Sequence, residues 1–186
     1  VTTALVVLTA SVSVGVPIWM GVSRYSPKKS VWLTGAGIVI LSQCILFFCS
    51  IPSVYGFLAV IAMLGLGNAA FYVTFWSMLP DTVEYGEFRT GLRDEGLVFG
   101  LNQLAHKAAT GIGIGLLGFL LELIGYVANQ PQSASTTEGI RVVAIFIPIL
   151  CGISSVALIS IYPISKPLHA RLVTAIDWRN ERRSQQ

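Results

Sequence analysis

Five apolar runs, separated by short polar segments, constrain this chain more than any other feature of its sequence. A run of about 20 apolar residues crosses a hydrocarbon core of ~30 Å as a helix. Lipid offers no hydrogen-bond partners to the backbone, so each run must satisfy its own N–H and C=O groups, as an α-helix does. Only 11% of the residues are charged, whereas soluble domains average about a quarter. The sequence therefore predicts an all-α, polytopic membrane protein.

The runs predict one transmembrane bundle over residues 1–162 and a polar tail over residues 163–186. The five predicted helices cover residues 3–22, 31–50, 54–79, 97–127 and 140–161. The segment between the third and fourth is expected to be a charged loop. In the tail, Leu168, Leu172 and Ile176 recur every four residues, which predicts an amphipathic helix on the inner leaflet.

Basic residues gather on one side of the predicted bundle. Five crossings leave only Arg141 on the opposite side. Apart from Lys107, which lies within a predicted helix, the remaining basic residues are Arg24, Lys28, Lys29, Arg89, Arg93, Lys166, Arg171, Arg179, Arg182 and Arg183. The positive-inside rule makes the side with ten the cytoplasmic one, in a cell (inner) membrane, with the C-terminus inside. An odd number of helices with an outer N-terminus leads us to expect a C-terminal part of a longer protein.

The stretch "GLNQLAHKAATGIG", residues 100–113, places polar groups inside the fourth predicted helix. Lys107 follows Leu97 by ten residues, or ~15 Å along a helix, which is near the membrane midplane. A lysine costs a few kcal/mol there, so its side chain should face protein or water. Gln103 lies one helical turn before Lys107 and is expected to share its face.

Two interpretations of this face stay open. In one, Lys107 and Gln103 line an aqueous cavity and bind a polar solute. In the other, Lys107 pairs with an acid of another helix for structure alone. Asn102 lies off the stripe, and His106 is expected to pack or to bond locally. The glycines farther along the helix, Gly111, Gly115 and Gly118, are expected to pack against a neighbouring helix.

The third predicted helix and the charged loop that follows it add further candidates. Tyr72 and Trp76 share a face of the third, where an aromatic ring suits stacking against a sugar, although Trp76 also fits an interfacial anchor. In the charged loop, Asp81, Glu84 and Glu87 are spaced to line one side of a helical extension. They are either charge pairs at a closing interface or a solvated loop. No nucleophile–base pair, metal-ligand spacing or phosphate loop is present, so catalytic residues, bound metals and nucleic-acid partners are not expected, and the chain is not expected to be an enzyme.

Three segments carry a family resemblance: "MLPDTVEYGEFRTGLRDEGLVFGLNQLAHKAATGIG", "LIGYVANQPQSA" and "GIRVVAIFIPI", all between Met78 and Ile149. They strongly resemble the glycoside–pentoside–hexuronide:cation symporters of the melibiose-carrier type, a family of the major facilitator superfamily. Upstream, "SRYSPKKS" is similar to the basic loop between the eighth and ninth helices. The resemblance implies that the five helices correspond to helices 8–12 of a twelve-helix major facilitator fold.

The resemblance also implies roles. Lys107 corresponds to the family's lysine in the sugar cavity, Asn102 and Gln103 to positions that help to line it, and Tyr72 to a tryptophan of the type member. Asp81, Glu84 and Arg93 correspond to inner charges linked to cytoplasmic closure. The expected activity is symport of a sugar-like solute with Na⁺, H⁺ or Li⁺ by alternating access, with the cation ligands mainly in a missing N-terminal half.

That half and the lipid bilayer are the other expected partners, and no cofactor is expected. Two alternatives remain: a carrier of lysolipids or other amphiphiles in the same superfamily, and a membrane scaffold or sensor that transports nothing.

Overall fold

The computed structural model describes residues 2–49, 51–162, 174–175 and 178, and its secondary structure is helical throughout the described part. Its five helices are α1 (Thr2–Tyr25), α2 (Lys28–Phe48), α3 (Val54–Thr90), α4 (Glu95–Leu123) and α5 (Ala134–Ile161). Each is long and apolar enough to cross a membrane, with mean hydropathy between 1.5 and 2.7 in its most apolar stretch. The predicted all-α class with five spans is confirmed.

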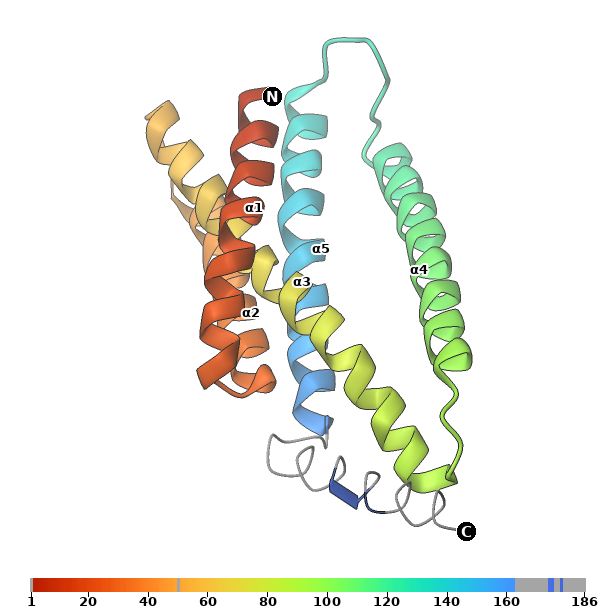
Figure 1. Cartoon of the computed structure of the whole chain (residues 1–186). Helices are drawn as coiled ribbons and strands as arrows, with labels where there is room; N and C mark the ends of the chain where they lie inside the picture. Colours follow the sequence, from red (N-terminus) through yellow and green to blue (C-terminus); the bar gives the residue numbers. More distant parts are fainter. Residues whose placement is uncertain (1, 50, 163–173, 176–177, 179–186) are drawn as a thin grey trace.

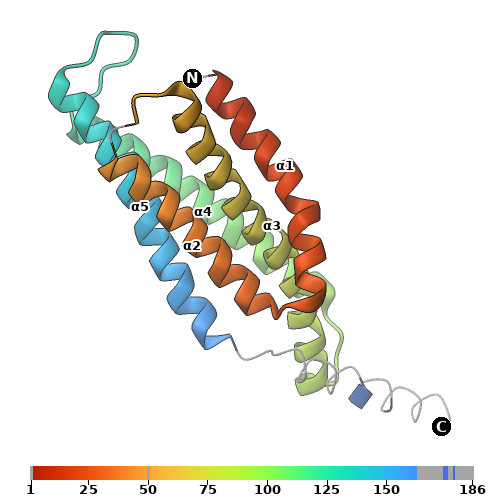
Figure 2. The ribbon, with the colours of Figure 1, turned by 90° about the vertical axis from the view of Figure 1, so that its left-hand side faces the viewer.

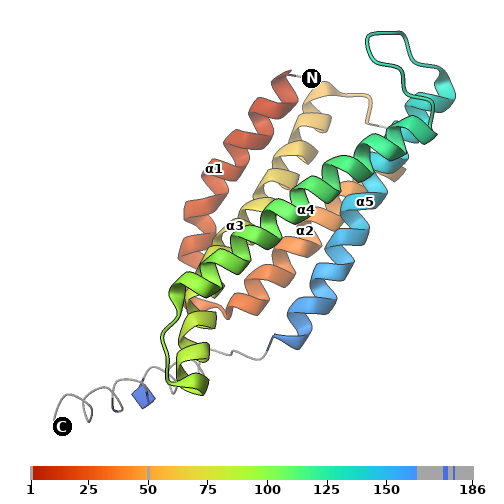
Figure 3. The same ribbon diagram turned by 90° about the vertical axis from the view of Figure 1, so that its right-hand side faces the viewer.

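Four of the helices form a bundle, and α4 stands to one side of it. Figures 1 and 2 show α1, α2, α3 and α5 side by side, while α4 is joined to α3 at one end and to α5 by a loop at the other. Figure 3 shows α4 crossing in front of the bundle. The end at which α1, α3 and α5 finish and α2 and α4 begin is called the inner end below. No residue of α4 is buried.

Small residues let α3 approach α1 and α2 closely. On the α1 side, a Cβ added to Gly65 would lie 2.8 Å from the carbonyl oxygen of Leu8. On the α2 side, a Cβ added to Gly35 would lie 2.5 Å from the Cβ of Ala70. Neither helix can admit a larger side chain at these points unless the backbones move apart.

Hydrogen bonds fasten α2 to α5 near both ends. At the inner end, Lys29 Nζ donates to the carbonyl oxygen of Ser160 at 2.9 Å. At the other end, Arg141 Nη2 donates to the carbonyl oxygen of Phe47 at 2.6 Å, and its guanidinium lies 5.5 Å from the centre of the Phe47 ring. Each cation lies against carbonyl groups in the last turn of the partner helix, where the backbone dipole favours positive charge.

The third helix is longer than its apolar run predicts. We expect it to end at residue 79, but α3 continues to Thr90, where Gly91 adopts a left-handed conformation (φ 78°) and donates its N–H to the carbonyl of Glu87. Pro80 lies within the helix and does not end it. The acidic segment stays helical because Asp81, Val83 and Glu87 are buried against the protein.

Caps set the starts of α4 and α5. Asp94 accepts a hydrogen bond from the N–H of Leu97 at 3.0 Å, so α4 begins at Glu95 and not at residue 97. Ser133 accepts one from the N–H of Thr136 at 3.1 Å, so α5 begins at Ala134, six residues before the predicted start at 140. The fourth helix ends at Leu123 and not at residue 127. The predicted amphipathic tail lies outside the described residues, except for Thr174, Ala175 and Trp178.

Candidate functional site

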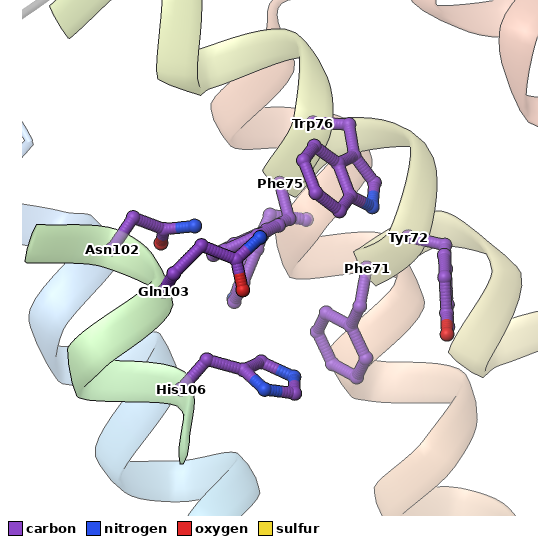
Figure 4. A pocket seen from close by; sticks show the side chains of 8 residues that line it. Phe71, Tyr72, Phe75, Trp76, Asn102, Gln103 and His106 are labelled. Carbon is purple, nitrogen blue, oxygen red and sulfur yellow. The ribbon is translucent and has the colours of Figure 1, made fainter. Parts of the chain in front are cut away.

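A cavity of about 450 Å³ lies between α3 and α4, with one residue of α2 at its edge. Figure 4 shows its walls at close range. It is lined by Trp32, Phe71, Tyr72, Phe75, Trp76, Asn102, Gln103 and His106. The volume is within the range of small-molecule sites, which is about 300–1,000 Å³.

The two main walls of the cavity differ in chemistry. The α3 wall is aromatic, because four aromatic residues recur on one helical face at positions 71, 72, 75 and 76. The α4 wall presents the two amides of Asn102 and Gln103 and the imidazole of His106. In Figure 4 the side chains of Gln103 and His106 extend from α4 toward Phe71 and Phe75. Such a cavity accommodates a molecule with one apolar face and one hydrogen-bonding edge.

Three of the four predicted solute-binding residues meet at this cavity. Asn102 and Gln103 lie on the α4 wall and Tyr72 lies on α3. In Figure 4 the Tyr72 ring is on the side of α3 that points away from α4. Tyr72 also lines a second cavity, of about 520 Å³, between α1 and α3. Their role in binding a solute stays a prediction.

The fourth predicted residue, Lys107, is not among the residues that line this cavity. The lining residues of α4 centre between Gln103 and His106, and Lys107 points about a quarter-turn away at about 100° per residue. Its side chain is exposed, and among the described residues none forms an ion pair or hydrogen bond with it. A bare lysine at mid-helix is costly in lipid, so this face must meet water or protein in a membrane.

Sequence reasoning missed several cavity residues. His106, which was expected to pack or to bond locally, lines the cavity. Trp76, for which the sequence left stacking or an interfacial anchor open, lines it too. Trp32, Phe71 and Phe75 had not been singled out. The repeat of aromatics at positions 71, 72, 75 and 76 was a usable signal, because it marks one face of a helix. The three glycines of α4 expected to pack have open space around them among the described residues.

Two of the predicted inner charges, Asp81 and Arg93, take part in separate groups of ion pairs. Lys28 Nζ lies 2.8 and 2.7 Å from the two carboxylate oxygens of Asp81, and it also donates to the carbonyl oxygen of Ser77 at 2.7 Å. Farther along, Arg93 lies 3.3 Å from the carboxylate of Glu87 and 2.6 Å from that of Glu95. Asp81 and Glu87 are each only 6% exposed. The alternative of a solvated loop is therefore wrong for the part of this segment that lies in α3.

Local charges shift two pKa values just outside the membrane-spanning helices. Hydrogen bonding to Glu95, and then the charge of Glu95, raise the pKa of Arg93 above its ordinary value. Burial, and then the charge of Asp81, raise the pKa of Tyr162 to about 12. Tyr162 follows α5 directly and Lys28 begins α2, so the start of α2 and the end of α5 both lie near Asp81 of α3. Glu84, which lies on α3 like Asp81, is half-buried.

Comparison with known proteins shows that the chain is similar to membrane transport proteins. The family model described as MFS/sugar transport protein matches residues 1–166. A glucuronide carrier protein homolog of Escherichia coli (strain K12) is 32% identical over 167 residues, covering 89% of this chain and 36% of the relative.

Two further relatives are similar. An isoprimeverose transporter of Lactiplantibacillus pentosus is 33% identical over 138 residues, covering 71% of this chain and 28% of the relative. An uncharacterized symporter of Bacillus subtilis (strain 168) is 30% identical over 160 residues, covering 85% and 34%. The chain thus spans about a third of the length of the curated relatives it matches.

Proposed function

The chain belongs to the MFS/sugar transport protein family, and from this premise we propose that it forms the C-terminal part of a secondary transporter for a sugar-like solute. Its helices would correspond to helices 8–12 of a twelve-helix fold. The remaining helices would supply the opposite wall of the cavity and most ligands of a coupling Na⁺, H⁺ or Li⁺. Relatives named for glucuronide and isoprimeverose transport, and one named as a symporter, support this proposal.

The observation that carries the proposal is the pairing of an aromatic wall with an amide wall at mid-membrane depth. A pyranose has an apolar C–H face that stacks on aromatic rings and hydroxyl groups that pair with amides, which both donate and accept. Gln103 lies eight residues into α4, or ~12 Å from its start, so the cavity is well inside the bilayer. When the two halves of such a transporter rock, a solute held at that depth becomes accessible from one side of the membrane and then from the other, as in alternating access.

The inner charges are proposed to stabilise one state of that cycle. Asp81, Glu84 and Arg93 lie at the inner end of the bundle, where closure toward the cytoplasm would occur. Arg93 joins the end of α3 to the start of α4 through Glu87 and Glu95. A movement of α4 relative to α3 would break or remake these pairs. The basic residues of this end support its placement in the cytoplasm, with the protein in a cell (inner) membrane.

Gln103→Ala tests the binding role of the α4 wall. In the full-length protein that carries this chain, we expect uptake of the transported sugar to fall about tenfold, because a polar contact with the solute is lost. Uptake of labelled sugar into cells, normalised to the amount of protein in the membrane, measures the effect. Lys107→Ala is the companion variant, since Lys107 is a predicted solute ligand beside the cavity.

Thr110→Ala is the matched control on the same helix. The Thr110 hydroxyl donates to the carbonyl of His106 in its own helix and lies outside the lining of the cavity. Uptake should change little in this variant. Normal uptake of every tested sugar in both Gln103→Ala and Lys107→Ala would contradict the assignment of the site.

A further inference from the structure

A further cavity, of about 520 Å³, lies directly beside the cavity between α3 and α4. Its walls come from α2, α3 and the last residues of α5, and it is called the apolar cavity below. Trp32 and Phe75 belong to the linings of both cavities, so the two cavities adjoin at these side chains. The groups that separate them therefore set how large a solute the α3–α4 cavity can hold.

The apolar cavity offers little to a polar solute. It is lined mainly by aliphatic and aromatic side chains, and none of the described residues that line it is charged. Of its hydroxyl groups, that of Ser155 already donates to the carbonyl oxygen of Gly152 at 2.9 Å. A sugar ring would lose hydrogen bonds on entering such a space, whereas an apolar substituent would be stabilised there by burial.

The indole of Trp32 is held in place by contacts on both sides. Its ring lies 4.8 Å from the ring of Phe71, between centres, a separation that aromatic pairs prefer. Its Nε1–H donates to Ser155 Oγ at 3.3 Å. Phe71 lines the α3–α4 cavity and Ser155 lines the apolar cavity. Both contacts form within this chain, so no helix outside it is needed to fix the indole between the two cavities.

Trp19 shows what an anchoring tryptophan does in this bundle. Its Nε1–H donates to the carbonyl oxygen of Leu66 at 2.8 Å and joins α1 to α3, and Trp19 is not among the described residues that line either cavity. Trp32 makes a longer, weaker hydrogen bond, of 3.3 Å, and it is the residue of α2 in the described lining of the α3–α4 cavity. Anchoring of helices therefore accounts for less of its position.

Resting on the proposed transport function, we propose that Trp32 is a specificity-determining residue that limits the size of the solute. Its indole, with the ring of Phe75, closes the α3–α4 cavity on the side of the apolar cavity. A sugar with a small substituent fits against the aromatic wall. A sugar with a bulky apolar substituent is excluded, because the substituent needs the space that the indole occupies. Without the indole the two cavities join, and the apolar cavity receives the substituent.

The test measures competition between two glycosides of one sugar. Full-length protein that carries this chain takes up a labelled methyl glycoside of glucose, xylose or glucuronic acid, and the unlabelled methyl or 2-naphthyl glycoside of the same sugar is added as competitor. The concentration of naphthyl glycoside that halves uptake, divided by that of methyl glycoside, measures the discrimination against bulk. We expect Trp32→Ala to lower this ratio about tenfold, since small changes in the volume of a pocket alter selectivity by at least that factor.

Further variants locate the effect at the wall between the cavities. Trp32→Phe should retain most of the discrimination, because a ring still separates the cavities. Phe75→Ala should lower the ratio as Trp32→Ala does, and it provides a second test if Trp32→Ala does not reach the membrane. Trp19→Ala is the matched control, since it also removes an indole that bonds to a neighbouring helix, and its ratio should equal that of the unaltered protein. A variant that merely folds poorly lowers total uptake and leaves the ratio unchanged.

The outcomes separate this inference from the function it rests on. A ratio that is unchanged in both Trp32→Ala and Phe75→Ala overturns the size limit but leaves sugar transport standing. A naphthyl glycoside that competes as well as the methyl glycoside for the unaltered protein overturns it too, as does an equal fall of the ratio in Trp19→Ala. Absence of uptake and of binding for glycosides of every sugar tested overturns the proposed function, and the size limit with it.

Discussion

Gly35→Val is expected to prevent the bundle from assembling, whereas Gly37→Val, two residues away on the same helix, should be tolerated. A Cβ at position 35 would lie 2.5 Å from the Cβ of Ala70 and 3.0 Å from the carbonyl oxygen of Gly67. The obstacles are backbone and a Cβ, which cannot rotate away. We expect a loss of at least about 3 kcal/mol in the free energy of unfolding, the upper range for overpacking.

Gly37 provides the control because a Cβ there has nothing within 4 Å. Both substitutions add the same apolar volume to the same membrane helix, so effects of membrane insertion cancel. The fraction of protein that elutes as a single species after heating in detergent measures assembly. Equal heat resistance of the two variants would show that α2 and α3 are not in close contact at this point.

Loss of Lys28 should damage the protein far more than loss of the adjacent Lys29. In Lys28→Gln the buried carboxylate of Asp81 is left without its cation, and breaking such a buried pair costs about 3 kcal/mol at the lower end of the known range. We take the lower end because the Lys28 side chain is 28% exposed. Lys29→Gln removes one hydrogen bond to a carbonyl, which is worth about 1 kcal/mol.

The double variant Lys28→Gln/Asp81→Asn separates charge from packing. It leaves two neutral groups that can bond to each other, so it should recover a large part of the stability that Lys28→Gln loses. Heat resistance in detergent and sugar uptake are both measured, because Asp81 is also proposed to stabilise a closed state. Lys28→Gln and Lys29→Gln variants of equal stability would contradict an important role for the ion pair.

The membrane-spanning part of the fold was predictable because lipid leaves the backbone few choices. Each apolar run had to be a helix, and each is one. The errors lie where an apolar run ends but the helix continues. Residues 81–90 are rich in charge, yet they continue α3 because its acids are buried beside basic partners. The start of α5 was placed late because a polar first turn, capped by Ser133, resembles a loop.

The site was only partly predictable, because a sequence gives the relative angles of side chains on a helix but not the direction in which the helix faces. The prediction centred the functional face of α4 on Lys107, the costliest residue. In the structure, the face of α4 between Gln103 and His106 points toward α3. His106 therefore lines the cavity, and Lys107 lies to one side of it. The rotation of α4 about its own axis depends on the helices around it, so it cannot be read from the α4 sequence alone.

The close contacts of α3 with its neighbours have a consequence for how such a protein evolves. Residues 65–70 of α3, which contain the small side chains that meet α1 and α2, directly precede the segment from which residues 71, 72, 75 and 76 line the cavity. Tyr72 and Trp76 are 63% and 50% exposed, so little of the bundle depends on their shape. Substitutions at the exposed positions 72 and 76 can therefore change which solute fits without disturbing the packing of residues 65–70. One helix thus holds a packing segment beside a cavity-lining segment, so a change of solute does not require a change of scaffold.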